Sequence, residues 1–211
     1  MSLDVHVRRL SAGPQVLLQD LHLNVPAGTI HTVMGASGSG KSSLLAAVCG
    51  TLNEALTFDG DITLNGRRID DLPTERRRVG ILFQEDLLFA HMTVRENLLF
   101  AVPAAPKAQA HTREDKVRQG LQDLEMADFA NADPATLSGG QRARVALMRA
   151  LLAEPLALLL DEPFSKLDQD LRARLRSFVF TQVARRQLPV LLVTHEDADI
   201  ADAACVTRLN T

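Results

Sequence analysis

Residues 35–42 read Gly35-Ala36-Ser37-Gly38-Ser39-Gly40-Lys41-Ser42, and this octapeptide decides the fold prediction. The apolar run Thr29–Met34 precedes it, and the run Ser43–Cys49, which has helical character, follows it. Glycines let the chain turn tightly and bring backbone N–H groups against phosphate oxygens, where a Cβ would obstruct. The octapeptide therefore predicts a strand, a phosphate-cradling P-loop and a helix in succession.

The P-loop offers both backbone and side-chain partners to a nucleotide. Lys41 would reach the β- and γ-phosphates as a point charge, and the Ser42 hydroxyl would ligate Mg²⁺. A glycine-rich turn before an ordinary helix is the alternative, and kinases, GTPases and many ATPases share the motif. The predicted nucleotide contacts of this segment are Gly35, Ala36, Ser37, Gly38, Ser39, Gly40, Lys41, Ser42 and Ser43.

A pair of acids follows a second apolar run, Leu158-Leu159-Leu160-Asp161-Glu162-Pro163. Ligands of open α/β sheets bind at the carboxyl ends of the strands. We expect Asp161 to hold Mg²⁺, directly or through water, and Glu162 to orient and partly deprotonate an attacking water. A solvated loop after a strand is the competing interpretation, and the P-loop upstream weighs against it.

The rest of the chain predicts an α/β fold with a mainly parallel sheet, an N-terminal antiparallel β subdomain and an inserted helical subdomain. Leu156–Leu160 and Val190–Thr194 are apolar throughout, as strands buried on both faces of a parallel sheet are. The predicted strands of the first third are Val5–Leu10, Leu17–Val25, Thr29–Met34 and Ile62–Leu64, with a hairpin turn at Asn65-Gly66.

Helical signals dominate the middle of the chain. Thr112-Arg113-Glu114-Asp115 fits a capping box, with Val117, Leu121 and Leu124 at helical spacing after it. A second helix should begin near Ser138 and end before Pro155, with Val145, Met148, Leu151 and Leu152 on one face. Ala101–Ala110 reads as a mobile connection. We expect one domain, 1–211, with a core subdomain at about 1–83 and 156–211 and a helical subdomain at about 84–155.

Composition excludes several classes of protein. The formal net charge is -3, so no overall basic field favours nucleic acid. No apolar stretch approaches the roughly 18 to 20 residues that span a bilayer, and the alternating start Met1–Val7 lacks the apolar core of a signal peptide. We therefore expect a cytoplasmic protein. Cys49 and Cys205 are far apart and suggest neither a disulfide scaffold nor a zinc site.

The segment Leu137-Ser138-Gly139-Gly140-Gln141 narrows the prediction to one family. With the P-loop before it and Asp161-Glu162 after it, it resembles the signature motif of the ABC (ATP-binding cassette) ATPases, over essentially the whole chain. Further matches follow in the family's order at Gln84, at Ser165-Lys166-Leu167-Asp168 and at His195. Independently, a serine and two glycines at a helix start form an anion site.

The resemblance implies roles for these residues. The signature of one subunit, Ser138, Gly139, Gly140 and Gln141, would close on the γ-phosphate of ATP held by the P-loop of a second ATPase subunit. A homodimer is expected, with a pair formed with a related chain as the alternative. Asp168 would lie in the loop that crosses this interface, with a role as a turn or cap residue as the alternative. The expected catalytic residues are Glu162, His195, Gln84 and Lys41, with His195 bonded to the γ-phosphate. The expected Mg²⁺ ligands are Ser42, Gln84 and Asp161.

The same resemblance implies a transport function. Residues 75–97 look like ATPases of bacterial binding-protein-dependent importers, including thiamine, polyamine and iron types, with export as the alternative. The expected partners are a transmembrane permease and an extracytoplasmic solute-binding protein, with the chain peripheral on the cytoplasmic side of the inner membrane. Leu87, Leu88 and Phe89 would form part of a groove for a permease helix or part of the subdomain core.

Two classes of non-transport ATPase are alternatives to a transporter subunit, and the sequence also departs from the family at one position. A repair ATPase of this superfamily would need a long coiled-coil insertion, and a translation factor would usually carry two cassettes; the sequence shows neither. Many family members stack adenine on an aromatic residue before the P-loop. This chain has no Tyr or Trp, and no Phe precedes Phe58, so the region Arg9–Gln15 offers no such ring.

Overall fold

The computed structural model describes residues 1–104, 110–165 and 167–209. Lys166 and most of the connection predicted at Ala101–Ala110 lie outside the described residues. Contacts group the chain into a core unit, which comprises Met1–Ile81, Leu156–Glu162 and Arg176–Thr211, and a helical unit, which comprises Leu82–Pro155 and Pro163–Leu175. The sequence-based boundaries leave Pro163–Leu175 in the core, whereas its contacts are with the helical unit.

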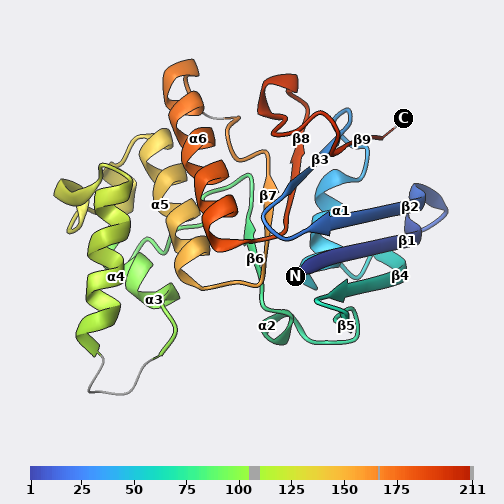
Figure 1. The fold of residues 1–211 in the computed structure, drawn as a ribbon, viewed down its shortest axis with the longest axis horizontal. Coiled ribbons are helices and arrows are strands. Elements are labelled where there is room, and N and C mark those ends of the chain that lie inside the picture. The colour runs from blue at the N-terminus through green and yellow to red at the C-terminus, as the bar shows by residue number, and fades with distance from the viewer. Residues whose placement is uncertain (105–109, 166, 210–211) are drawn as a thin grey trace. The chain divides into compact units, whose positions relative to one another are not determined.

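An antiparallel sheet forms the first part of the core unit. Its strands are β1 (Ser2–Ala12), β2 (Gln15–Pro26), β4 (Leu56–Leu64) and β5 (Arg67–Arg68), in the order β2-β1-β4-β5 (Figure 1). The alternation of apolar and polar residues in Met1–Val7 is typical of a half-buried strand. Leu3, Val5 and Val7 are buried on one face of β1. Asn65 and Gly66 both have positive φ, 55° and 75°, which confirms the predicted tight hairpin between β4 and β5.

A parallel sheet forms the second part. Its strands are β6 (Val79–Leu82), β7 (Ala157–Asp161), β8 (Val190–Thr194), β3 (Ile30–Met34) and β9 (Val206–Arg208), in that spatial order. Every residue of β7 and β8 is buried, as their continuous apolar sequences predicted. Because β7, β8 and β3 are parallel neighbours, the residues that follow each strand meet at one edge.

Helix α1 (Lys41–Cys49) follows β3 and contacts β7 and β8. Its buried leucines, Leu44 and Leu45, join one apolar cluster with the inner faces of both sheets. The P-loop is therefore held between a buried strand and a buried helix. The remaining helices of the core unit are α2 (Thr74–Arg77), a 3-10 turn at Asp197–Asp199 and the C-terminal part of α6 (Gln169–Arg186).

The helical unit contains α3 (Val94–Ala101), α4 (Ala110–Asp123), α5 (Gly139–Leu152) and the first turns of α6, with 3-10 turns at Ala127–Phe129 and Pro134–Thr136. Helices α3, α4 and α5 lie together in Figure 1. The predicted apolar faces are confirmed, since these side chains are buried: Val117, Leu121, Leu124, Val145, Met148, Leu151 and Leu152.

One local prediction was wrong. Thr112 does not cap a helix, because α4 already includes Ala110 and Thr112 lies within its first turn. A threonine and an acid three residues apart also occur inside helices, where they lie on one face. Among the described residues of this unit, capping boxes occur at Thr93 with Glu96 and at Ser138 with Gln141.

Candidate functional site

The P-loop follows β3, and its glycines have the backbone that the motif predicted. Gly38 has φ +82° and Gly40 has φ +89°, both in the left-handed region that favours glycine. A Cβ on Gly40 would also lie 3.2 Å from the Cβ of Leu17 on β2. The loop therefore runs close to β2 immediately before α1 begins at Lys41.

Lys41 lies folded over its own loop. Its Nζ donates to the carbonyl oxygens of Gly35 at 2.7 Å and Ala36 at 2.8 Å, and the residue is only 6% exposed. An ammonium bonded to neutral carbonyls can exchange them for phosphate oxygens, which are better acceptors because they are charged. The ammonium group therefore lies beside the positions where phosphates bind in a P-loop.

A buried carboxyl group, that of Asp161, lies beside the hydroxyl of Ser42. Asp161 ends β7, is 7% exposed and makes a side-chain hydrogen bond with Ser42. Burial raises the pKa of Asp161 and the charge of Glu162 adds to this effect, while the Ser42 bond and the charge of Lys41 oppose it. Oxygen donors of this kind suit Mg²⁺, and a cation beside them would relieve the cost of a buried charge. These residues therefore fit a magnesium ion.

Glu162 and His195 meet although 33 residues separate them. Each follows a parallel strand, β7 and β8, and the N–H of Glu162 donates to the carbonyl of Val193 on β8 at 3.0 Å. Glu162 Oε1 lies 3.0 Å from Nδ1 of His195. The acid has φ +46°, a conformation that is uncommon for a residue with a side chain. The core unit thus gathers the P-loop, Asp161, Glu162 and His195 at one edge of its sheet.

The segment Leu137–Gln141 opens α5. Ser138 is the N-cap: its Oγ accepts from the N–H of Gln141 at 3.2 Å, and Gln141 Oε1 accepts from the N–H of Ser138 at 2.8 Å. A Cβ on Gly140 would lie 2.5 Å from Leu171 Cδ2, whereas one on Gly139 would have nothing nearer than Arg142 Nη2 at 3.8 Å. Gly140 therefore permits close packing, and Gly139 keeps the exposed helix start open.

Two further predicted residues also belong to the helical unit. Gln84 is exposed and lies two residues after the end of β6. Asp168 is exposed and its Oδ1 accepts from the N–H of Leu171 at 2.9 Å, so it caps the first turn of α6. Sequence reasoning missed Asn97, which is fully buried and bonded to the loop between Gln84 and α3. A signal was present in Thr93-x-x-Glu96, because this capping box marks the start of the helix that carries Asn97.

The P-loop after β3, the buried carboxyl group on β7 and the acid–histidine contact define a P-loop nucleoside triphosphatase of the α/β class. The family model described as ABC transporter matches residues 18–165, more than half of the chain. The protein therefore belongs to the ABC transporter family of ATP-binding proteins, and its cassette is an ATPase.

Similar curated proteins carry related names. The chain is 50% identical over 184 residues to the "Uncharacterized ABC transporter ATP-binding protein YnjD" of Escherichia coli K12, covering 87% of this chain and 84% of that protein. It is 39% identical over 207 residues to the "Sulfate/thiosulfate import ATP-binding protein CysA" of a Bacillus cereus strain. That match covers 97% of this chain but only 57% of CysA, so the chain spans little more than half of that relative's length.

Solved structures with this fold include a dimer. The "Dimeric Structure of MJ0796, a Bacterial ABC Transporter Cassette" matches with a TM-score of 0.81 and 26% identity, covering 98% of this chain and 94% of that one. A second structure of MJ0796, in a post-hydrolysis state bound to ADP and Pi, matches equally well. Among the described residues, no helix is long and apolar enough to cross a bilayer.

Proposed function

We propose that this chain is the nucleotide-binding subunit of an ABC importer, in which ATP hydrolysis drives a solute through a separate transmembrane permease. One observation carries the proposal: the chain has two helix starts suited to phosphate, at Lys41 and at the capped Ser138. A nucleotide bound to one subunit needs only one of these helix starts from that subunit, so the second helix start is available to another nucleotide. Two copies can therefore each supply a P-loop to one nucleotide and a signature to the other.

The core unit supplies most of the groups for hydrolysis. Glu162 orients the attacking water and accepts its proton, and the 3.0 Å contact with His195 fixes the carboxylate for this task. Lys41 leaves its loop carbonyls for the β- and γ-phosphates, while His195 bonds the γ-phosphate. A bound Mg²⁺ would neutralise phosphate charge, with Ser42, Asp161 and Gln84 as its protein ligands. Little covalent chemistry is required, because phosphoryl transfer depends mainly on position and charge.

The second subunit completes the site. The N–H groups at the start of α5 and the hydroxyl of Ser138 bind the γ-phosphate of the partner's ATP, assisted by the positive end of the helix dipole. ATP then favours the closed dimer, and product release reopens it. The dimeric cassette of MJ0796 supports this arrangement by analogy.

Import is supported by the names of relatives. Sulfate/thiosulfate import ATP-binding proteins from Bacillus, Salmonella and Mycobacterium are 36–40% identical to this chain over 194–207 residues. We therefore propose a permease and an extracytoplasmic solute-binding protein as partners, with the chain peripheral on the cytoplasmic side of the inner membrane. Nucleic acid is not a proposed partner.

The test is isolation of the complex from membranes through an affinity tag on this chain. We expect an integral-membrane permease to co-purify in equal amount with a pair of ATPase subunits. Vesicles that contain this complex should take up solute only with ATP on the cytoplasmic side and binding protein on the other. Export from the same vesicles would refute import, and co-purification with ribosomes or DNA in place of a permease would refute transport.

A further inference from the structure

The loop after Gln84 contains a strained residue. Leu87 has φ +45°, in the left-handed region that a residue with a Cβ enters at a cost in free energy. Its side chain is 53% exposed, so burial of the leucine does not offset this cost. Contacts with the backbone of the loop must therefore stabilise the conformation.

Arg149 on α5 makes these contacts. Its Nη1 donates to the carbonyl of Leu87 at 2.8 Å, and its Nη2 donates to the carbonyl of Asp86 at 3.3 Å. The guanidinium carbon lies 5.3 Å from the ring centroid of Phe89. A planar guanidinium can bond two carbonyls and cover an aromatic face at once, which the ammonium of lysine cannot do.

The chemistry of Arg149 indicates a dedicated contact. Burial lowers the pKa of its guanidinium, and no carboxylate contributes to that shift. A desolvated cation bonded to neutral carbonyls is costly unless the geometry is good. The side chain therefore serves the backbone of the loop and not a surface ion pair.

Other contacts fix the same loop on either side of Leu87. Arg142, two turns earlier on α5, has its Nε 3.4 Å from Asp86 Oδ2. The side-chain carbonyl of buried Asn97 accepts from the N–H of Phe89 at 2.8 Å. The segment from Asp86 to Phe89 is thereby attached to α5 and α3 within the helical unit.

We propose that Arg149 is a positioning residue that holds Leu87 in its left-handed conformation and so attaches the loop of Gln84 to the helix that begins at Ser138. The inference rests on the proposed function, in which Gln84 and Ser138 both act at ATP. A displacement of α5 on ATP binding is then transmitted to Gln84 through the Arg149 contacts. The positioning of Gln84 becomes coupled to engagement of the signature segment.

The first test measures the loop directly. Arg149→Lys is compared with Arg144→Lys, a matched control on the same helix whose Nη1 donates to the carbonyl of Leu124 at 2.8 Å. Amide hydrogen exchange of residues 84–89 should be about tenfold faster in Arg149→Lys than in Arg144→Lys, because only the former loses the loop contacts. Equal rates in the two variants overturn the proposal.

The second test uses strain relief. Glycine enters the left-handed region without steric cost, so Leu87→Gly should make the loop less dependent on the arginine. We expect Arg149→Lys to lower kcat about tenfold with little change in KM for ATP, since the P-loop lies in the other unit. The double variant Arg149→Lys/Leu87→Gly should have a kcat at least about threefold higher than that of Arg149→Lys alone. The control Arg144→Lys should keep the kcat of the parent protein. A double variant no faster than Arg149→Lys contradicts the strain mechanism.

A third variant separates this inference from the proposed function. If Gln84→Ala hydrolyses ATP at the normal rate, the role proposed for Gln84 fails, and hydrogen exchange alone decides whether Arg149 holds the loop. If Gln84→Ala is impaired while Arg149→Lys keeps normal kcat and normal exchange, the proposed function stands and the Arg149 inference fails.

Discussion

Glu162 Oε1 and His195 Nδ1 lie 3.0 Å apart, each immediately after one of two adjacent parallel strands. The contact depends on strand order, because β7 and β8 bring together residues that 33 positions separate. The left-handed backbone of Glu162 departs from the strand directly after Asp161. In the proposed function, this contact orients the carboxylate toward the attacking water.

The first prediction concerns this acid. Glu162→Gln should cut kcat on the order of 10²- to 10⁴-fold, because the amide keeps the shape of the side chain but cannot accept a proton. ATP binding should persist, since Lys41 and the P-loop amides are unchanged. Steady-state ATPase assays and nucleotide titration measure the two effects. Near-normal turnover would remove Glu162 from the catalytic role.

The second prediction concerns Asp161 and pH. Burial raises the pKa of this carboxyl group, so between its ordinary pKa and the raised value the folded state binds more protons than the unfolded state. The free energy of unfolding therefore falls as pH rises through that window. Asp161→Asn should remove this pH dependence and raise Tm at pH 7 by about 2–4 °C, the shift expected for ~1 kcal/mol in a chain of this length.

The same substitution should lower ATPase activity, although it stabilises the fold. Asp161→Asn replaces a charged ligand with a neutral one, so Mg²⁺-dependent ATPase activity should fall on the order of 10²-fold or more. Thermal unfolding from pH 4 to 8 without nucleotide, alongside activity at several Mg²⁺ concentrations, tests both halves. A variant that is less stable at pH 7 than at pH 4 would show that another group causes the pH dependence.

The third prediction concerns Arg77, which is 8% exposed and donates to four backbone carbonyls. Two of its acceptors are Ala47 and Val48 in the last turn of α1, at 2.8 and 3.1 Å. A cation is favourable at a helix C-terminus, and the bonds satisfy carbonyls that the helix leaves unpaired. Arg77 thus stabilises the C-terminal end of α1, the helix that follows the P-loop.

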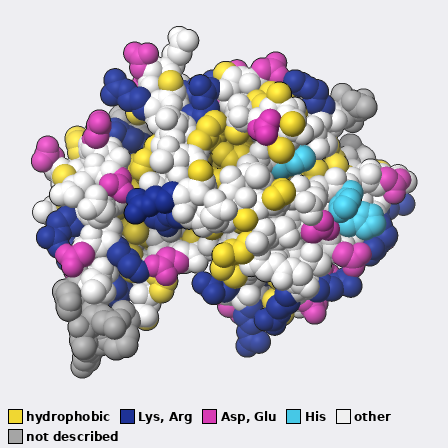
Figure 2. All heavy atoms as spheres, viewed as in Figure 1, with side chains coloured by type: hydrophobic (Ala, Val, Ile, Leu, Met, Phe, Trp, Pro, Cys, Tyr) yellow, Lys and Arg dark blue, Asp and Glu magenta, His cyan; other side chains and the backbone are white. Residues whose placement is uncertain are grey.

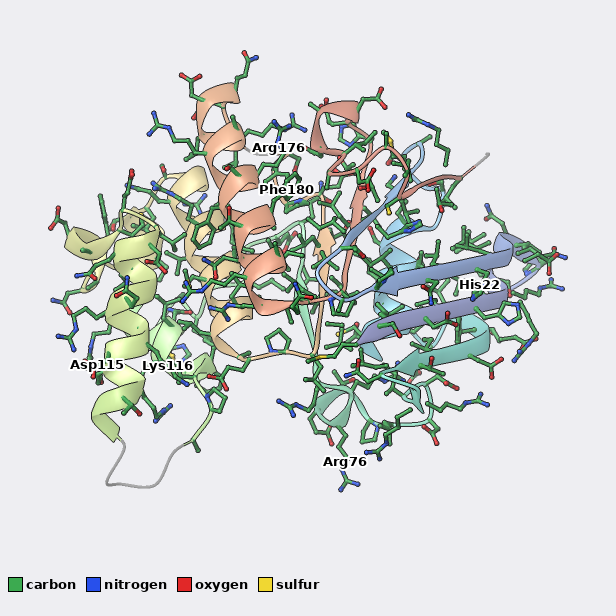
Figure 3. All side chains as sticks on the ribbon, in the orientation of Figure 1. His22, Arg76, Asp115, Lys116, Arg176 and Phe180 are labelled. Carbon is green, nitrogen blue, oxygen red and sulfur yellow. The ribbon has the colours of Figure 1, made fainter. Side chains whose placement is uncertain are left out.

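Arg77→Ala should destabilise the protein by about 3 kcal/mol, because several buried carbonyls lose their donor. The matched control is Arg76→Ala: Arg76 is exposed and its side chain points away from the fold (Figure 3), so the change should stay within about 0.5 kcal/mol. Lys and Arg side chains gather on the surface around α2 (Figure 2), which makes Arg76 typical of that face. Urea unfolding curves compare the variants, and equal midpoints would contradict the role of Arg77.

The sequence predicted most elements of this fold because their signals are local. The apolar runs Leu156–Leu160 and Val190–Thr194 and the turn at Asn65-Gly66 each carry a strand or hairpin pattern within a few residues. The failure at Thr112 is also local, since one short pattern fits a helix start and a helix interior. Boundaries of this kind need the surrounding contacts.

Long-range contacts account for what the sequence did not predict. The strained backbone of Leu87 is stabilised by an arginine 62 residues later, and no pattern near Leu87 signals it. Similarly, the contact between Glu162 and His195 required the order of the strands. The residue types of the site could be predicted, whereas the interactions that orient them could not.

The fourth prediction separates two roles of Ser138. Its hydroxyl caps α5 through Gln141, and its exposed position at the helix start suits a phosphate from another subunit. Ser138→Asp keeps an N-cap acceptor but adds negative charge beside the proposed phosphate position. Ser138→Asn is the matched control, because it caps equally well without charge.

The free energy of unfolding of both variants should lie within about 0.5 kcal/mol of that of the parent protein. In the Glu162→Gln background, which keeps ATP intact, size-exclusion chromatography with ATP should show a dimer for Ser138→Asn and a monomer for Ser138→Asp. Charge repulsion at the γ-phosphate is the only intended difference between them. An ATP-dependent dimer of Ser138→Asp, with the same apparent affinity as its control, would show that the signature segment does not face nucleotide and would end the model of a shared site.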